Sequence, residues 1–157
     1  EIPDFKLNRP IHYCKSEAIA SLLEYNDKEN ASGLTAIEVA IINQRIEVVN
    51  IFLTKTKIDS KRLFFAAAIS NSDKSISFLL KEKHFKLDCP MELLMRTAEN
   101  GAYEVFKFLI SQKIEIDYEL RNSENENILE VSKRVGNVGI SRYLEKDFKN
   151  RRNKVLA

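Results

Sequence analysis

One short pattern, two brief apolar stripes separated by a polar break, most limits what this chain can fold into. In residues 33–53, GLTAIEVAIINQRIEVVNIFL, each stripe has the period of an α-helix and the break falls at 43–45. Thr35 and Glu38 have the spacing of a capping box, which predicts a helix start at this point. The segment therefore predicts two helices of roughly 8 to 10 residues. Helices this short do not persist alone and must pack against neighbours.

The same pattern recurs along the chain. With Ala40 as the anchor, Ala67, Thr97 and Ser132 fall in the equivalent place at successive offsets of 27, 30 and 35 residues, and residues 4–25 offer a partial copy. Repeats of this length indicate a solenoid of stacked helix pairs. We therefore expect an all-α fold with about nine or ten short helices and no substantial sheet. The approximate boundaries are 1–28, 29–59, 60–88, 89–118 and 119–148, followed by a basic tail, 149–157.

These residues resemble the ankyrin repeat. The stretch RPIH at 9–12 is the closest copy of its helix-start signature, and GLTAIEVA at 33–40 keeps the Gly and Thr of that signature. Gly101 and Gly136 stand at the inter-helix glycine position, where two other copies carry Gln44 and Asn71. Aspartates close three of the copies, at Asp59, Asp88 and Asp117. The resemblance implies an ankyrin-like solenoid of about five helix-turn-helix repeats.

The chain also departs from the family pattern. Offsets of 27 and 30 are shorter than the family's repeat of about 33, so the turns between the second and fourth repeats should be clipped. Pro90 favours a helix start at that residue. Only about four residues separate His12 from Glu17, so the first repeat should be compressed or lack one helix. Irregular outer repeats are typical of solenoids, because they face solvent.

Composition places the chain among globular proteins and gives no electrostatic lead. Of its 157 residues 44% are hydrophobic and 31% are charged, with 25 basic against 23 acidic side chains. This balance makes a nucleic-acid partner unlikely, and no apolar run is long enough to cross a membrane. The distant Cys14 and Cys89 suit a reducing, cytoplasmic compartment. The start at Glu1, without Met or a signal pattern, predicts a fragment of a longer protein.

Nothing in the pattern predicts catalysis within this segment. His12 belongs to the repeat signature, where the family resemblance implies a structural hydrogen bond, and His84 lies beside Phe85 in a loop. The four glycines form no phosphate-binding loop, and the cysteines and histidines lack the spacing of metal ligands. A stack of short helices provides a groove in place of a catalytic pocket. We expect no enzyme activity, no cofactor and no metal in this segment.

The resemblance implies a protein partner, bound by the turn tips and the ends of the first helices. Apolar Leu34, Ile42, Ile69 and Val135 have no core to fill if this register is correct; a small misalignment would bury some of them. The expected partner-binding residues are Ser32, Leu34, Ile42, Asn43, Lys61, Arg62, Ile69, Ser70, Glu99, Asn100, Ser123, Glu124, Glu126, Arg134 and Val135. A protein-protein interaction module is the first hypothesis. The alternative is a substrate-recruiting domain of a larger enzyme, such as a microbial effector acting in host cytoplasm.

The basic tail has two readings. Its five Lys and Arg residues could contact phosphate or direct nuclear targeting, or they could complement the dipole at the end of the last helix. The second reading is favoured, because a soluble terminal repeat needs a polar end. Lys55 is expected to be an ordinary solvated residue, and the domain is expected to be monomeric on its own.

Overall fold

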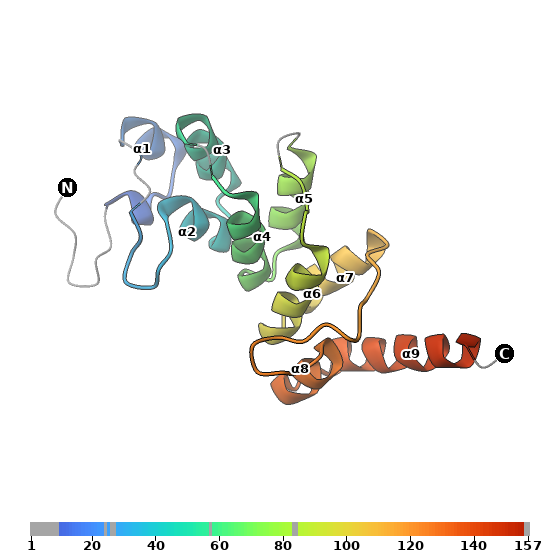
Figure 1. Ribbon diagram of the computed structural model, residues 1–157. Helices are drawn as coiled ribbons and strands as arrows, with labels where there is room; N and C mark the ends of the chain where they lie inside the picture. The colour runs from blue at the N-terminus through green and yellow to red at the C-terminus, as the bar shows by residue number, and fades with distance from the viewer. Residues whose placement is uncertain (1–9, 24, 26–27, 57, 83–84, 156–157) are drawn as a thin grey trace. The chain divides into compact units, whose positions relative to one another are not determined.

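All the regular secondary structure in the described residues is helical. The computed structural model describes residues 10–23, 25, 28–56, 58–82 and 85–155, and His84 lies outside these ranges (Figure 1). The described residues contain nine α-helices, one short 3-10 helix and no strand, which confirms the all-α prediction. The elements are η1 (Pro10–Tyr13), α1 (Glu17–Leu22), α2 (Ala36–Ile42), α3 (Ile46–Lys55), α4 (Ser60–Ile69), α5 (Asp73–Lys81), α6 (Pro90–Glu99), α7 (Tyr103–Ser111), α8 (Ile128–Val135) and α9 (Val138–Val155).

Segment 33–53 contains two helices, α2 and α3, as its polar break predicts. The first repeat is compressed, because a single 3-10 turn, η1, stands in the place of its first helix. Pro90 is the first residue of α6, also as expected. Proline is tolerated there because the first N–H groups of a helix have no partner within it.

Each of the four complete helix pairs turns through one residue with a left-handed backbone. These residues are Gln44, Asn71, Gly101 and Gly136, with φ between 47° and 77°. They are the positions at which the repeat pattern expects its inter-helix glycine. At two of these turns the backbone N–H of the following residue makes an equivalent hydrogen bond. Arg45 donates to Ala40 O at 2.9 Å, and Ala102 donates to Thr97 O at 2.8 Å. The four helix pairs therefore share one turn geometry, which is what a true structural repeat requires.

This turn geometry predicts opposite stability changes at two equivalent positions. Gln44→Gly should raise the free energy of unfolding by about 0.5–1 kcal/mol, because glycine adopts positive φ without steric cost. Gly136→Ala should lower it by about 1 kcal/mol. A Cβ at Gly136 would meet no atom within 4 Å, so the loss would come from the backbone alone. Urea denaturation of both variants tests this, and changes of the same sign would contradict it.

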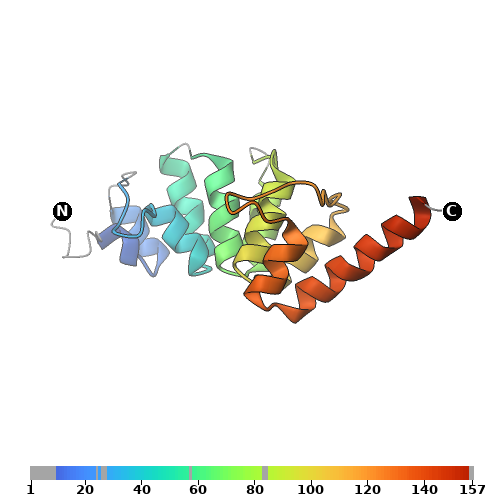
Figure 2. The same cartoon turned by 60° about the horizontal axis from the view of Figure 1, so that its bottom comes forward.

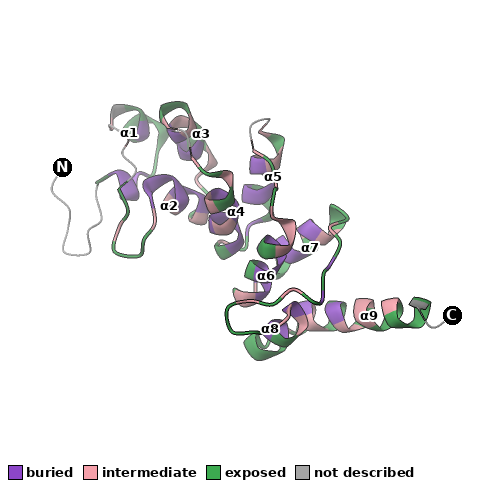
Figure 3. Ribbon diagram, in the orientation of Figure 1, coloured by how far each residue is buried: buried purple, intermediate pink, exposed green. Residues whose placement is uncertain are grey.

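The chain divides into two compact units, Glu1–Asp88 and Cys89–Ala157, and each is described by itself. In the first unit α2 packs against η1, α3 and α4, while α1 packs on α3 and α4 on α5. Figure 3 shows that most of α2 and much of α4 is buried. The core of this unit is built from aliphatic and aromatic side chains, among them Ile37, Phe52, Phe64 and Leu79.

Hydrogen bonds from side chains tie consecutive repeats of the first unit together. The guanidinium of Arg45 donates to Cys14 O at 2.7 Å, and the hydroxyl of Ser75 donates to Ile41 O at 3.4 Å. His12 is buried, and its Nε2 lies 3.2 Å from Lys28 O. This is the structural role predicted for His12.

The second unit repeats this arrangement. There α6 packs against α7 and α8, and α9 packs against α8 and α7. Asn137, which follows the left-handed Gly136, donates from its side-chain amide to Gly101 O at 2.8 Å. A Cβ at Gly139 would lie 2.7 Å from the ring of Tyr103, so only glycine allows α9 to approach α7 this closely. In both units, therefore, inter-helix turns of successive repeats are bonded to each other.

Two predictions from the sequence are wrong in detail. Lys61 and Arg62 were expected at a turn tip, but they lie in the first turn of α4, which the side chain of Asp59 caps by accepting the N–H of Lys61. The short spacing between the second and third repeats leaves the third repeat without a loop tip. Lys55 is not an ordinary solvated residue, because its ammonium donates to the carbonyl oxygens of Ala20, Ser21 and Leu23 at 2.9, 3.1 and 2.9 Å. It thereby satisfies the free carbonyl groups at the end of α1.

The basic tail is no separate segment, because α9 continues without a break to Val155 (Figure 2). Its first half is anchored in the unit through the buried Ile140 and Leu144. Along its second half Arg151 pairs with Asp147 one turn earlier, at 2.8 Å. Such a pair supports the helix from its own surface.

Candidate partner-binding surface

Two loop tips, one in each unit, share the same backbone structure. In the first unit the N–H of Asn30 donates to Leu34 O at 2.9 Å, and in the second the N–H of Asn122 donates to Glu126 O at 3.0 Å. The side-chain oxygen of each asparagine accepts two further backbone N–H groups of its own tip. The predicted residues Ser32, Leu34, Ser123, Glu124 and Glu126 all lie in these two tips.

Each tip leads into a helix that begins with a carboxylate reaching back. The N–H of Thr35 donates to Glu38 at 2.8 Å before α2, and the N–H of Asn127 donates to Glu130 at 2.8 Å before α8. The capping box predicted at Thr35 is therefore present. This bond gives one otherwise free N–H at the helix start a partner and fixes the angle at which the tip leaves the helix.

Arg62 ties the first tip to the neighbouring repeat. Its guanidinium donates to both carboxylate oxygens of Glu38 at 2.8 Å, to Glu29 at 2.8 Å and to the Gly33 carbonyl at 3.1 Å. The side chain of Glu38 is only 5% exposed, whereas that of Arg62 is 42% exposed. Hydrogen bonds to Glu38 and Glu29 raise the pKa of Arg62 further above its ordinary value. Arg62 therefore holds the first tip in place, and its predicted contact with a partner stays a prediction.

The ends of α2 and α4 place two isoleucines at equivalent positions. Ile69 is 48% exposed and Ile42 is half-buried. The following residues, Asn43 and Ser70, use their side chains to bond carbonyls of the preceding turn, at 2.7 Å in both cases. Ile42 and Ile69 are therefore the apolar side chains at the ends of α2 and α4. Asn43 and Ser70 instead form hydrogen bonds to the last turns of these helices.

In the second unit the predicted charged residues gather into one cluster. Arg134 contacts Glu126 through Nε and Nη2, at 2.9 and 2.8 Å to its two carboxylate oxygens, and Nη2 reaches Glu124 at 3.2 Å. Asn122 donates to Glu126 at 3.5 Å and to Glu99 at 3.3 Å. The hydrogen bonds from Arg134 lower the pKa of the Glu126 carboxyl. Four of the predicted residues, Glu99, Glu124, Glu126 and Arg134, are thus linked at one tip, Glu99 through Asn122.

Two further predicted residues lie at the inter-helix turns of the second unit. Val135 is 37% exposed and is the last residue of α8. Its methyl group lies where it would meet a Cβ built on Gly101, at 3.5 Å. Asn100 caps α6 by donating from its side chain to Arg96 O at 2.8 Å. Like Asn43 and Ser70, it has a structural task.

The described part of the chain shows neither a metal site nor a membrane-spanning helix. Within it no three His, Cys, Asp or Glu side chains come together as a metal site would require. Of the helices described, none has the length and apolar character needed to span a bilayer. Cys14 is buried, and this burial raises the pKa of its thiol, so it is not an activated nucleophile.

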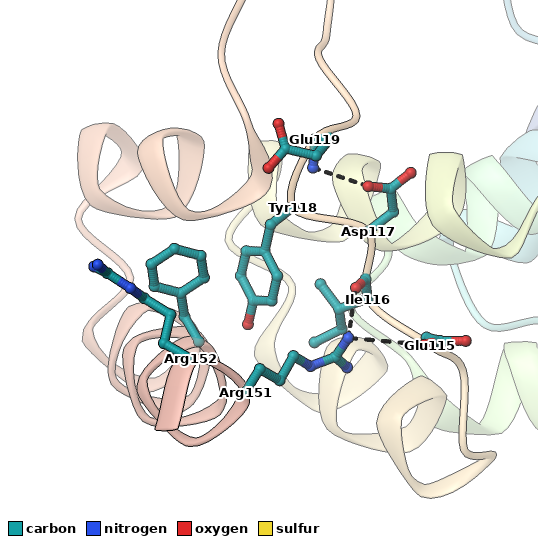
Figure 4. Close-up of a pocket in the computed structure, with 8 residues that line it drawn as sticks. Glu115, Ile116, Asp117, Tyr118, Glu119, Arg151 and Arg152 are labelled. Carbon is teal, nitrogen blue, oxygen red and sulfur yellow. Dashed lines mark hydrogen bonds and ion pairs between the residues drawn. The ribbon is translucent and has the colours of Figure 1, made fainter. Parts of the chain in front are cut away.

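The sequence did not indicate one pocket of the second unit. It has a volume of about 690 Å³ and lies between the loop 115–119 and the second half of α9 (Figure 4). Tyr118 and Phe148 meet edge to face in its wall, with ring centroids 5.0 Å apart. The hydroxyl of Tyr118 is buried and donates to Leu144 O and Asp147, both at 3.0 Å. Burial, together with the bond to Asp147, raises the pKa of Tyr118.

No pattern in the sequence predicts this pocket. Tyr118 follows Asp117, the residue that closes the fourth repeat, and Phe148 lies four residues before Arg152 on α9. These residues meet because α9 passes beside the loop 115–119. A repeat alignment compares repeats with one another and does not show which of their residues come into contact.

Neither a scan of the chain against protein-family models nor a search of curated proteins found a match.

Proposed function

We propose that this is an ankyrin-like repeat domain that binds another protein through its loop tips and the ends of its first helices. The observation that carries the proposal is the pair Ile42 and Ile69 in the first unit. They occupy equivalent ends of two helices that pack together, and Ile69 is exposed where no core needs it. Apolar side chains held on a rigid support are typical anchors of a protein interface.

Three features of the structure support the ankyrin-like assignment. The left-handed residue recurs in all four complete helix pairs, at the position of the family's inter-helix glycine. His12 of the RPIH signature is buried and bonded to the backbone of the next loop. The tips at 30–34 and 122–126 are tightly bonded turns that precede a first helix. A rigid tip presented beside a first helix is well suited to recognition, because little conformational freedom is lost on binding.

The test compares the wild-type chain with a double variant, Ile42→Glu together with Ile69→Glu. Affinity capture with the wild-type chain supplies a partner, and isothermal titration then measures binding to both proteins. We expect the double variant to lose about 2 kcal/mol or more, roughly a 30-fold rise in Kd, because two charges enter the desolvated centre of the interface. A control variant, Arg152→Gln with Lys154→Gln, should change the affinity far less.

Thermal unfolding of both variants accompanies the titration. The double variant should keep a cooperative transition, because Ile69 is exposed and Ile42 is only half-buried. If the control variant loses binding while the double variant keeps it, the assigned surface is wrong. If the melting temperature of the double variant collapses, the two isoleucines serve the core and the surface must be sought elsewhere.

A further inference from the structure

The even charge balance of the whole chain conceals a segregation of charge in the second unit. On α9, four basic side chains, Arg142, Lys146, Arg152 and Lys154, are exposed and form no ion pair with any described residue. Lys149 is also exposed, and its charge helps to lower the pKa of Glu145. The acidic side chains of α9 are already engaged, Glu145 with Lys133 at 2.9 Å and Asp147 with Arg151 at 2.8 Å. The solvent side of α9 is therefore an uncompensated basic surface.

Helical geometry places four of these residues, Arg142, Lys146, Lys149 and Arg152, on one continuous face of α9. Arg142, Lys146 and Lys149 follow at spacings of four and three residues, which place them above one another on the helix surface. Arg152 lies one turn further on, beside Lys149, and is also a lining residue of the aromatic pocket. Through Arg152 the basic face thus reaches the pocket at the second half of α9.

The pocket has three chemically different sides. Its apolar wall is formed by Ile116, Tyr118 and Phe148, and Arg152 lies on the α9 side. Across from α9, the loop contributes carboxylates, of which Glu119 bonds to no described residue through its side chain. At about 690 Å³ the pocket lies in the range of small-molecule sites.

We propose that α9 and this pocket bind single-stranded nucleic acid, with phosphates along the basic face and one base in the pocket. A nucleotide is anionic at its phosphate and neutral at its base, and the base carries N–H donors at its edge. Cations on α9 match the phosphate, the partly exposed ring of Phe148 matches the face of the base, and the carboxylate of Glu119 matches the donors. An aromatic side chain beside a cationic track is how proteins hold single strands without sequence preference.

Other occupants fit these features less well. An acidic peptide would bring its carboxylates against those of the loop. A protein interface needs apolar anchors, and Lys is depleted in such interfaces. The described exposed residues of α9 beyond Asp147 are Lys149, Asn150, Arg152, Asn153 and Lys154, none of them apolar. A double-stranded nucleic acid could bind the basic face, but it has no unpaired base to enter the pocket.

The test measures binding by fluorescence anisotropy with a labelled 20-nucleotide single-stranded DNA of mixed sequence. We expect the wild-type chain to bind this strand at least 10-fold more tightly than the duplex of the same sequence. Affinity should fall steeply with salt, because each neutralised phosphate releases counterions. The triple variant Lys146→Gln, Lys149→Gln, Arg152→Gln should bind at least 10-fold more weakly, and its log–log salt slope should be shallower by about 2.

Two further variants complete the design. The control Lys74→Gln, Lys107→Gln, Lys113→Gln removes the same charge from other exposed positions and should bind within about 3-fold of wild type. Phe148→Leu should weaken single-strand binding about 10-fold while leaving duplex binding unchanged, because stacking on the ring is lost. Since Phe148 also packs on Tyr118, melting curves accompany this variant. The triple variant changes only exposed residues and decides the outcome if the Phe148 variant unfolds.

Several results would overturn the proposal. Absence of binding at low salt, equal or tighter duplex binding, or an equal loss in the control variant each exclude it. Displacement of the strand by an equal charge concentration of poly-glutamate would assign the surface to an acidic protein segment. Binding of adenosine monophosphate as tight as that of the strand, and insensitive to the triple variant, would assign the pocket to free nucleotides. The variant Ile42→Glu, Ile69→Glu should bind DNA normally, so this proposal and the protein-binding proposal can fail separately.

Discussion

Arg62→Met should destabilise the protein by about 2–3 kcal/mol. The change removes two hydrogen bonds of 2.8 Å from the carboxylate of Glu38, which is 5% exposed, and leaves this charge with the Thr35 N–H and hydroxyl as its described donors. Removing one partner of a fully buried ion pair costs about 3–5 kcal/mol. The cost here should be smaller, because Arg62 is 42% exposed and water can approach from its side.

A second substitution separates the effect of the unpaired charge on stability from the effect of lost side-chain packing. The double variant Arg62→Met with Glu38→Gln should be more stable than Arg62→Met alone. Glutamine can still accept the Thr35 N–H in the capping box, and it needs no counter-charge. If Glu38→Gln lowers stability further in the Arg62→Met background, the loss comes from packing of the arginine stem and the ion-pair explanation is wrong.

The matched control lies in the equivalent box of the last repeat. Arg121 pairs with Glu130 at the same distance, 2.8 Å, but their side chains are 42% and 52% exposed. Arg121→Met should therefore cost less than about 1 kcal/mol, as exposed ion pairs do. Urea denaturation midpoints of the wild-type chain and the three variants, interpreted with a common slope, provide the comparison. An equal loss for Arg62→Met and Arg121→Met would show that burial of the carboxylate does not matter.

The repeat pattern was enough to predict the helix pairs, their order and their turns. Gln44 and Asn71 adopt the same left-handed backbone as Gly101 and Gly136, although neither is a glycine. The alignment identified these positions because the apolar stripes on both sides fix the register of the turn. Periodicity is a property of neighbouring residues, so a single sequence contains it.

Contacts between residues far apart in sequence were not predictable in this way. The clamp of Arg62 on Glu38, the bond of Lys55 to the end of α1 and the pocket around Tyr118 join residues 24 to 35 positions apart. Each depends on how far a helix extends and which way a long side chain turns. A pattern of apolar residues carries neither kind of information. For this reason Ser32 and Leu34 were placed correctly at a tip, whereas Arg62 was expected at a tip and lies instead in the first turn of α4, where it clamps the neighbouring tip.

Ala67→Leu tests the register of the repeats themselves and should destabilise the protein by about 1–3 kcal/mol. Ala66, Ala67 and Ala68 are all buried, and Ala67 has no exposed surface. It lies in α4, which packs against α2 and α5 of the same unit, and a small residue there allows the helices to approach closely. Leucine adds three carbon atoms to a site without space, and overpacking of this kind costs 1–3 kcal/mol. The control Ala31→Leu makes the same change at an exposed tip position and should shift the urea midpoint very little. A midpoint unchanged by Ala67→Leu would mean that α4 is rotated about its axis, and the equivalence of Ile69 with Ile42 would fail with it.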